Sequence, residues 1–369
     1  MTSPKAGMTR RHVLTGAMLA CPVQAFAQPA ASPRRPIMPP SIRPATPKDL
    51  PALVALLTED AEQRRSLDPL LWRIAPDAPA RIERAVGAAL DGPQTPAREL
   101  WHVAEDAGRV VGVTHAMLVP VPPIYDSAAG APGLLFDDCF ISAEAPSETA
   151  DALLAATEAA LKTAGAMRLV ASCPAAGPLR ALYEHHRYEP VTLYMAKHRF
   201  SSGGLPPRVQ PASAAHVPGI VKRSAEHRRT LARINPGFWH IHPEADSRFD
   251  TWMRRSLTLK DRDMFVAIEA GAVHGYVIAQ PISSLLVPAA HEAAAIGVID
   301  DFHDDDFADV SAVSNGGSHG ANLLSAAESA FARRRVDSIL VVCPAAWSSK
   351  ISLLEQQGYR AAKFWMLRR

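Results

Sequence analysis

The sequence has few of the features that mark a disulfide scaffold, a membrane protein or a strongly charged nucleic-acid binder. Four cysteines in 369 residues are too few for a disulfide framework. The 39 basic and 37 acidic side chains nearly balance, which argues against binding nucleic acid through net charge. No uninterrupted apolar stretch reaches the roughly 18 residues that a membrane-spanning helix needs. What remains is a globular chain, 48% hydrophobic and long enough for two domains.

The first 27 residues have the order of an export signal. Arg10 and Arg11 precede a short apolar run, and small residues at 25–27 flank a cleavage point that would leave Gln28 first in the mature chain. Paired arginines are typical of the twin-arginine route, so we expect a periplasmic protein. Residues 28–40 are rich in proline and alanine, which predicts an extended linker.

Two alternatives stay open for this leader. Cys21 follows Leu19 and Ala20, which would also suit a lipoprotein signal. Met38 directly precedes the region with the patterning of a folded domain, and a chain that starts there would be cytoplasmic. The expected compartment therefore depends on which of three interpretations holds: a twin-arginine signal, a lipoprotein signal or a start at Met38.

The rest of the chain repeats itself once. Segments of residues 41–200 match segments of 208–369 in the same order, and small changes in their separation are those expected of loop insertions and deletions. The matched pairs include Pro44/Pro211, Arg64/Arg228, Trp72/Trp239, Gly112/Gly275, Asp137/Asp300, Cys173/Cys343 and Tyr188/Tyr359. We infer that a whole domain was duplicated, and that residues 201–207, rich in glycine and proline, link the two copies.

Both copies predict the same series of elements. In the first copy we expect strands at 41–44, 100–105, 110–119, 134–141, 168–173 and 192–198, and helices after Thr46 and at 79–90, 149–163 and 177–186. A turn at 106–108 joins the second and third strands into a hairpin.

This order of elements, with Ile-Arg-Pro-Ala-Thr at 42–46, resembles the GNAT superfamily of N-acetyltransferases. Gly108, Gly112 and the sequence Ala-Leu-Tyr-Glu at 181–184 add to the resemblance, which covers nearly all of residues 41–369 as two tandem copies. The resemblance implies an α/β fold with the mixed sheet of an α+β protein, flanked by helices. The sheet splays open between its fourth and fifth strands. It also implies acetyl-CoA as co-substrate and a small-molecule amine as acceptor.

In the GNAT family the pyrophosphate of the co-substrate lies on backbone N–H groups where the helix after the fourth strand begins. Such a helix start attracts anions, and glycines let the backbone approach them. The matching residues of the second copy are Asn315, Gly316, Gly317, Ser318, His319 and Gly320. The first copy has no glycine at 145–150, and its Glu148 would repel phosphate. We therefore expect the second copy to bind acyl-CoA and the first to carry a degenerate loop.

The resemblance also suggests residues for the reaction. A tyrosine on the last short helix is the general acid of many family members, and Tyr183 has that place in the first copy, whereas the second copy has Leu354. Asp300 and Asp301 on the fourth strand are candidates for the general base, although buried structural carboxylates explain them equally well. Trp239 and His240 lie where the fold builds its acceptor pocket, although core packing also explains the tryptophan.

Other chemistries fit the sequence less well. Residues 316–320 spell Gly-x-Ser-x-Gly, but no histidine follows His319, so the chain order of a hydrolase triad fails. His240, His242 and the acidic run at 300–306 suggest a metal site only weakly, and we expect no metal. The leading hypothesis is an N-acyltransferase. The rival is a non-catalytic GNAT-like protein that binds a ligand or pairs its two domains within one chain, since an exported protein would not meet acyl-CoA readily.

Overall fold

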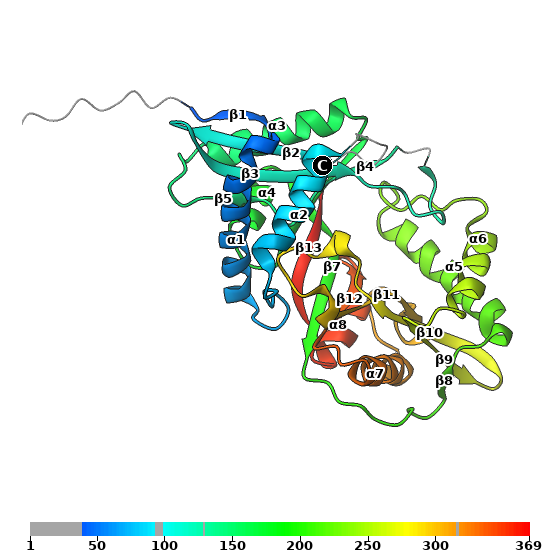
Figure 1. The fold of residues 1–369 in the computed structure, drawn as a ribbon. Coiled ribbons are helices and arrows are strands. Elements are labelled where there is room, and N and C mark those ends of the chain that lie inside the picture. The colour runs from blue at the N-terminus through cyan, green and yellow to red at the C-terminus, as the bar shows by residue number, and fades with distance from the viewer. Residues whose placement is uncertain (1–38, 93–98, 128–129, 315–316) are drawn as a thin grey trace, which may run out of the picture. The chain divides into compact units, whose positions relative to one another are not determined.

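The chain builds one continuous sheet with helices packed along it (Figure 1). The structure, a computed structural model, describes residues 39–369 apart from 93–98, 128–129 and 315–316. The predicted export signal, Asn315 and Gly316 thus lie outside the described residues. From residue 39 onward the chain forms one compact unit, and no helix in its described part is long and apolar enough to cross a membrane.

The two halves repeat one order of elements. The first half contains β1 (Ser41–Pro44), η1 (Pro47–Asp49), α1 (Leu50–Leu67), α2 (Ala78–Asp91), β2 (Glu99–Asp106), β3 (Arg109–Leu118), β4 (Pro132–Leu135), β5 (Phe140–Ile141), α3 (Thr149–Thr163), β6 (Arg168–Pro174), α4 (Pro178–His185) and β7 (Tyr188–His198). The second half contains β8 (Val209–Pro211), η3 (Ala214–His216), α5 (Val217–Ile234), α6 (Ala245–Ser256), β9 (Asp263–Glu269), β10 (Ala272–Pro281), η4 (Ser284–Leu286), η5 (Ala293–Ala295), β11 (Ile296–Asp304), η6 (Asp305–Phe307), α7 (Ser318–Arg333), β12 (Ser338–Pro344), α8 (Ser348–Gln356) and β13 (Arg360–Arg368).

The sheet splays open once in each half, as the resemblance implied. β4 pairs in parallel with β6 up to Leu135, and β11 pairs in parallel with β12 up to Ile299. Beyond these residues the paired strands separate. The strand predicted at 134–141 is wrong as one element, because the chain leaves β4 after Leu135 and only the short β5 resumes pairing with β3. The break exposes the backbone carbonyl of Asp137, which accepts hydrogen bonds from Cys139 and Arg64 instead of a strand neighbour.

The closing strands of the two halves are exchanged. The strand order runs β1-β2-β3-β4-β6-β13-β7-β12-β11-β10-β9-β8, so β13 of the second half lies between β6 and β7 of the first (Figure 1). β13 is antiparallel to both neighbours, and β7 is in turn antiparallel to β12. Each half therefore completes its sheet with backbone hydrogen bonds from the other half.

Candidate functional site

A pocket of about 280 Å³ in the first half is lined by several ionisable side chains. We call it the first-half pocket. It is walled by α1, α2, β2, β3 and, from the second half, residues 284–291. Asp60, Glu99, His115 and Asp138 are among its lining residues, so the pocket carries an excess of negative charge. Such a pocket favours a cationic ligand.

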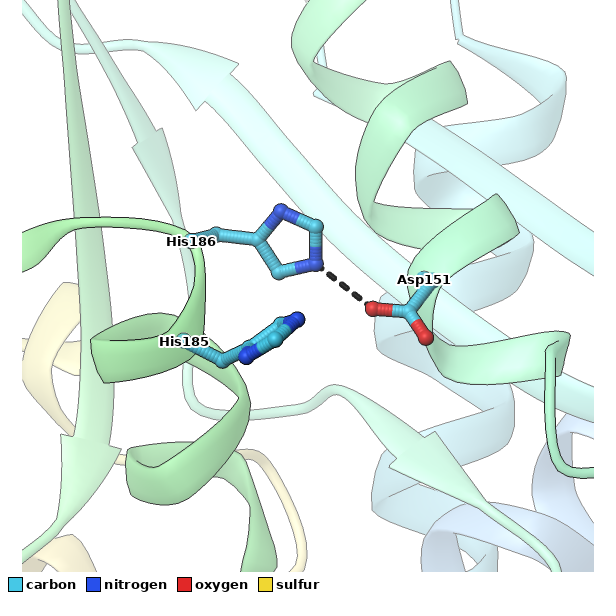
Figure 2. A group of neighbouring side chains, drawn as sticks. All are labelled: Asp151, His185 and His186. Atoms are coloured by element: carbon cyan, nitrogen blue, oxygen red, sulfur yellow. Dashed lines mark hydrogen bonds and ion pairs between the residues drawn. The ribbon is translucent and has the colours of Figure 1, made fainter.

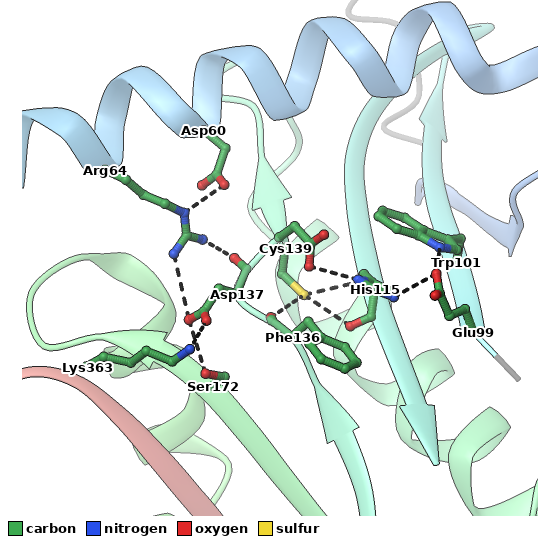
Figure 3. Close-up of polar contacts among 11 residues, drawn as sticks. Asp60, Arg64, Glu99, Trp101, His115, Phe136, Asp137, Cys139, Ser172 and Lys363 are labelled. Atoms are coloured by element: carbon green, nitrogen blue, oxygen red, sulfur yellow. Dashed lines mark hydrogen bonds and ion pairs between the residues drawn. The ribbon is translucent and has the colours of Figure 1, made fainter. Parts of the chain in front are cut away.

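His115 lines this pocket and contacts two aromatic and two acidic side chains. Its ring stacks between Trp101 and Phe136, with centroid distances of 4.0 and 4.5 Å. Nδ1 lies 2.8 Å from Asp138 Oδ1. Nε2 lies 3.3 Å from Glu99 Oε2 (Figure 3). Burial opposes a charge on this ring, but Asp138 and then Glu99 outweigh it and raise the pKa of His115 to about 9. The side chain is therefore an imidazolium at neutral pH.

Arg64 joins Asp60 and Asp137, which both line this pocket (Figure 3). Lys363, on the exchanged strand β13, forms a buried ion pair with Asp137, and Ser172 donates to Asp137 Oδ1 at 3.1 Å. Arg64 donates from Nε to Asp60 Oδ2 at 2.8 Å and from its other end to the Asp137 carbonyl. Burial raises the pKa of Asp60 to about 6, although Arg64 opposes this shift.

A second cavity of about 260 Å³ opens on the other side of Asp60. We call it the α3–α4 cleft. Its walls are mostly apolar and come from α1, which adds the polar Gln63 and Arg64, from β5, from Ala150 on the first turn of α3 and from residues 174–182. Asp60 lines both this cleft and the first-half pocket. A buried carboxylate thus stands where two cavities meet, one acidic and one apolar.

Two histidines lie beside the start of α3. His186 Nε2 is 2.6 Å from Asp151 Oδ1, and the ring of His185 lies close to the same carboxylate (Figure 2). Their three ligand atoms lie within 4.8 Å of one another. Asp151 and His185 are exposed. We call this group the surface triad.

The second half has a pocket of its own, of about 390 Å³. This second-half pocket contains the predicted residues Asp300, Asp301 and Trp239, together with Tyr125 from the first half. Gln280 Nε2 donates to Asp300 Oδ2 at 2.6 Å. Desolvation by the surrounding protein, followed by the charge of Asp301, raises the pKa of Asp300 above its usual value, although the residue is exposed.

Asp301 is the better-held of the two carboxylates. Tyr276 Oη donates to Asp301 Oδ1 at 2.6 Å, and His227 Nδ1 lies 3.1 Å from the same atom. Burial opposes the charge, but His227 and Tyr276 lower the pKa of Asp301 overall. The sequence thus predicted two carboxylates and a tryptophan that share this pocket. It did not predict the residues that contact the carboxylates, which are Gln280, Tyr276 and His227.

The start of α7, predicted to hold pyrophosphate, is already occupied by a side chain. Asp306 Oδ2 accepts the backbone N–H of Gly320 at 2.9 Å. A Cβ on Gly317 or on Gly320 would overlap Leu353 of α8, so these glycines serve close packing of the helix start. A carboxylate at this N–H competes with phosphate and repels it. The prediction that residues 315–320 bind the co-substrate stays a prediction, and this contact counts against it.

The splay that follows is filled by side chains. Lys350, fully buried, donates to the Phe302 carbonyl at 2.7 Å and lies over the rings of Phe302, Phe307 and Trp347. Trp347 Nε1 donates to the Phe307 carbonyl at 2.9 Å. The described part of the splay in the second half is therefore filled by buried side chains.

The other predicted site residues are placed away from these cavities. Tyr183 is 1% exposed and packs against Tyr188, and burial raises its pKa well above the usual value. His240 Nε2 lies 3.1 Å from Arg168 Nη2, and His240 is not among the described lining residues of the second-half pocket. Sequence reasoning missed Asp60, Glu99 and His115, because a helix residue and two strand residues of unremarkable spacing meet only in the folded chain.

Comparison with known proteins identifies the fold. No protein-family model matches the sequence, and no curated protein is similar to it. A GCN5-related N-acetyltransferase from Sphaerobacter thermophilus superposes with a TM-score of 0.51 at 15% identity, over 89% of this chain and 95% of that one. A tandem GNAT protein from the clavulanic acid biosynthesis pathway gives 0.47 at 13% identity, over 89% and 97%. A GNAT-family acetyltransferase from Colwellia psychrerythraea gives 0.46 at 12%, over 89% and 98%. The first match confirms the predicted GNAT fold, which this chain builds as two tandem domains.

Proposed function

We propose that the chain is an acyl-CoA-dependent N-acyltransferase, in the simplest case an acetyltransferase, and that its reacting centre lies in the first half. The observation that carries the proposal is the position of Asp60, which lines both the acidic first-half pocket and the apolar α3–α4 cleft. A transferase needs two such cavities, one for each reactant, with a proton acceptor where they meet. The sequence alone placed the co-substrate in the second half.

The α3–α4 cleft fits part of an acyl-CoA better than the start of α7 does. Its apolar lining suits the pantetheine arm and the acyl group. Glu148 and Asp151 at the start of α3 oppose a pyrophosphate, and the contact between His186 and Asp151 offsets one of them. When bound, an acyl-CoA supplies an acyl group activated as a thioester.

The chain's own residues then handle the amine. An amine that is cationic in water enters the first-half pocket, where Glu99 and Asp138 outweigh His115 in charge. The amine must lose a proton before its nitrogen can attack the acyl carbon. As the C–N bond forms the thioester C–S bond breaks, and the thiol of CoA leaves with the second amine proton. Asp60, whose pKa of about 6 leaves it ionised at pH 7, accepts the first proton. Arg64 holds the carboxylate in place through Oδ2. The predicted roles of Tyr183 as acid and of Asp300 or Asp301 as base stay predictions.

A binding test separates the two halves. In a thermal-shift titration of the full chain, acetyl-CoA should raise the melting temperature by mass action. Ala150→Glu, on the first turn of α3, should abolish the shift, whereas Ala321→Glu, on the first turn of α7, should leave it. A shift lost only in Ala321→Glu would return the site to the second half. No shift at millimolar acetyl-CoA would rule out the transferase.

A kinetic test addresses Asp60. With a panel of small amines and detection of the released thiol, Asp60→Asn should lower kcat roughly 10²- to 10⁴-fold and leave the KM for acetyl-CoA unchanged. In the wild type, activity should fall as the pH drops through about 6, and the variant should lose this dependence. Ser224→Ala, four residues before Arg228 as Asp60 is before Arg64, is the matched control and should behave as wild type.

A second candidate function rests on the second half. Asp306 accepts an N–H at the start of α7, and side chains fill the gap between β11 and β12. The second-half pocket is open, and Trp239, Trp252 and Asp300 are among its lining residues. These features suit a domain that binds a ligand without catalysis, as the rival sequence hypothesis holds. In either case the periplasmic localisation is our proposal from the leader, and mapping the mature N-terminus tests it.

A further inference from the structure

Two buried carboxylates where β11 passes into η6 lack part of their hydrogen bonding. Asp304 and Asp306 are 0% and 1% exposed. One oxygen of each is used, since Asp304 Oδ1 accepts the Asp306 N–H and Asp306 Oδ2 accepts the Gly320 N–H, both at 2.9 Å. The other two oxygens, Asp304 Oδ2 and Asp306 Oδ1, are buried and have no hydrogen-bond donor among the described residues. Unpaired buried carboxylates are costly, so this pair calls for a counter-charge or a proton.

The cationic side chains around the pair contact other groups, and one of them, Arg208, lies with its Nη1 3.3 Å from His319 Nε2. Arg223 Nη1 bonds Asp305 Oδ1 at 2.7 Å, and His274 Nδ1 lies 2.9 Å from Asp305 Oδ2. The neighbouring carboxylate is thereby neutralised, whereas Asp304 and Asp306 form no salt bridge within the described part of the chain. The fold also makes room for Asp304, because a Cβ on Gly275 would overlap its Oδ2. The pair is built into the fold and left without a counter-charge.

His319 adds a third potential ligand to the two carboxylates. One ligand atom from each of Asp304, Asp306 and His319 lies within 4.8 Å of the other two. Two atoms bound to one ion at about 2.0–2.5 Å lie no more than about 5 Å apart, so the spacing already suits a single cation. The three residues come from the end of β11, from η6 and from the first turn of α7.

We propose that Asp304, Asp306 and His319 bind one divalent cation of the first transition row, with Zn²⁺ and Mn²⁺ as the chemical types. Two carboxylates and an imidazole suit such an ion better than the all-oxygen shells of Ca²⁺ or Mg²⁺. The bound cation supplies the counter-charge that the pair lacks. It also ties β11 and η6 to α7, at the place where the fold would otherwise present N–H groups to a phosphate.

The test is metal-dependent stability of the full chain. After treatment with EDTA and dialysis, Zn²⁺ or Mn²⁺ alone should raise the melting temperature, and elemental analysis should find bound metal. Asp304→Asn is the central variant, because the amide has the shape of the carboxylate and lacks its charge. It should fold without metal, as circular dichroism would show, and lose the thermal shift. Asp306→Asn should also lose the shift.

The surface triad supplies the matched control. Asp151→Asn removes a ligand from that exposed group, and the metal-induced shift should survive in this variant. Wild type and Asp151→Asn should both retain more bound metal than Asp304→Asn does. A shift that persists in Asp304→Asn, or that disappears in Asp151→Asn, would overturn the proposal. No shift and no bound metal in the wild type would also overturn it, and would mean that Asp304 and Asp306 share a proton instead.

Discussion

At the scale of single residues, the ion pair of Lys363 and Asp137 joins the two halves of the chain. Both side chains are almost fully buried, at 1% and 2% exposed. Lys363→Met should destabilise the protein by roughly 3–5 kcal/mol, because it leaves the Asp137 carboxylate buried with Arg64 and Ser172 as its remaining side-chain partners in the described part of the chain. Equilibrium urea unfolding measures this loss.

The double variant Lys363→Met with Asp137→Asn is the control for this pair. Removing both charges relieves the unpaired carboxylate, so the double variant should regain much of the lost stability. If the single and double variants unfold at the same urea concentration, the charge of Asp137 is not what Lys363 stabilises. Packing of the lysine stem would then explain the loss.

At the scale of elements, the exchange of β7 and β13 makes the two halves one folding unit. β13 is hydrogen-bonded to β6 along one edge and to β7 along the other. A protease site inserted within residues 202–204 should therefore allow cleavage of the linker without separating the fragments. They should co-elute in size-exclusion chromatography and separate only in denaturant. Fragments that separate in native buffer would show that the exchanged strands contribute little to the association.

Much of this fold could be predicted from the sequence, but the exchange could not. Local apolar periodicity, the hairpin turn and the internal matches were enough for the order of elements in both copies. The closing strands carry Met195 and Met366 in similar apolar runs, so either strand fits either sheet by pattern. Which sheet each one joins depends on contacts far apart in sequence, which periodicity does not record.

The candidate sites divide in the same way. Asp300, Asp301 and Trp239 share a pocket, as their positions in the family pattern suggested. Asp60 was out of reach, because its significance comes from lying between two cavities walled by distant segments. The glycine-rich loop pattern at 315–320 identified a helix start but could not show that Asp306 occupies its N–H.

At the scale of the whole molecule, each half closes the pocket of the other. Ile74 forms a backbone bridge with His291, and the matching Ile241 forms one with Tyr125. Tyr125 then lines the second-half pocket and His291 the first-half pocket. Both pockets therefore depend on how the halves pack, and a change at this contact reaches the two sites together.

His291 makes this contact sensitive to acid. Its Nδ1 lies 3.1 Å from the Trp72 carbonyl, and its Nε2 is buried without a partner among the described residues. Burial, followed by the charge of Arg64, lowers the pKa of His291 to about 4. In the unfolded chain the pKa of this histidine returns to its usual value of about 6.5. Its contribution to the unfolding free energy is therefore complete above about pH 6.5 and is lost as the pH falls toward 4.

Between pH 7 and pH 4.5 this single group should cost the wild type roughly 2 kcal/mol of unfolding free energy. Urea unfolding at both pH values measures the loss, and His291→Phe should show a correspondingly smaller one. The quantity to compare is the difference between the losses of the two proteins. Buried carboxyls with raised pKa values, such as Asp60, stabilise the fold as the pH falls, and they do so equally in every variant. His185→Asn, an exposed histidine, should keep the full wild-type loss. Equal losses in His291→Phe and the wild type would mean that acid acts on the molecule elsewhere than at the contact between its halves.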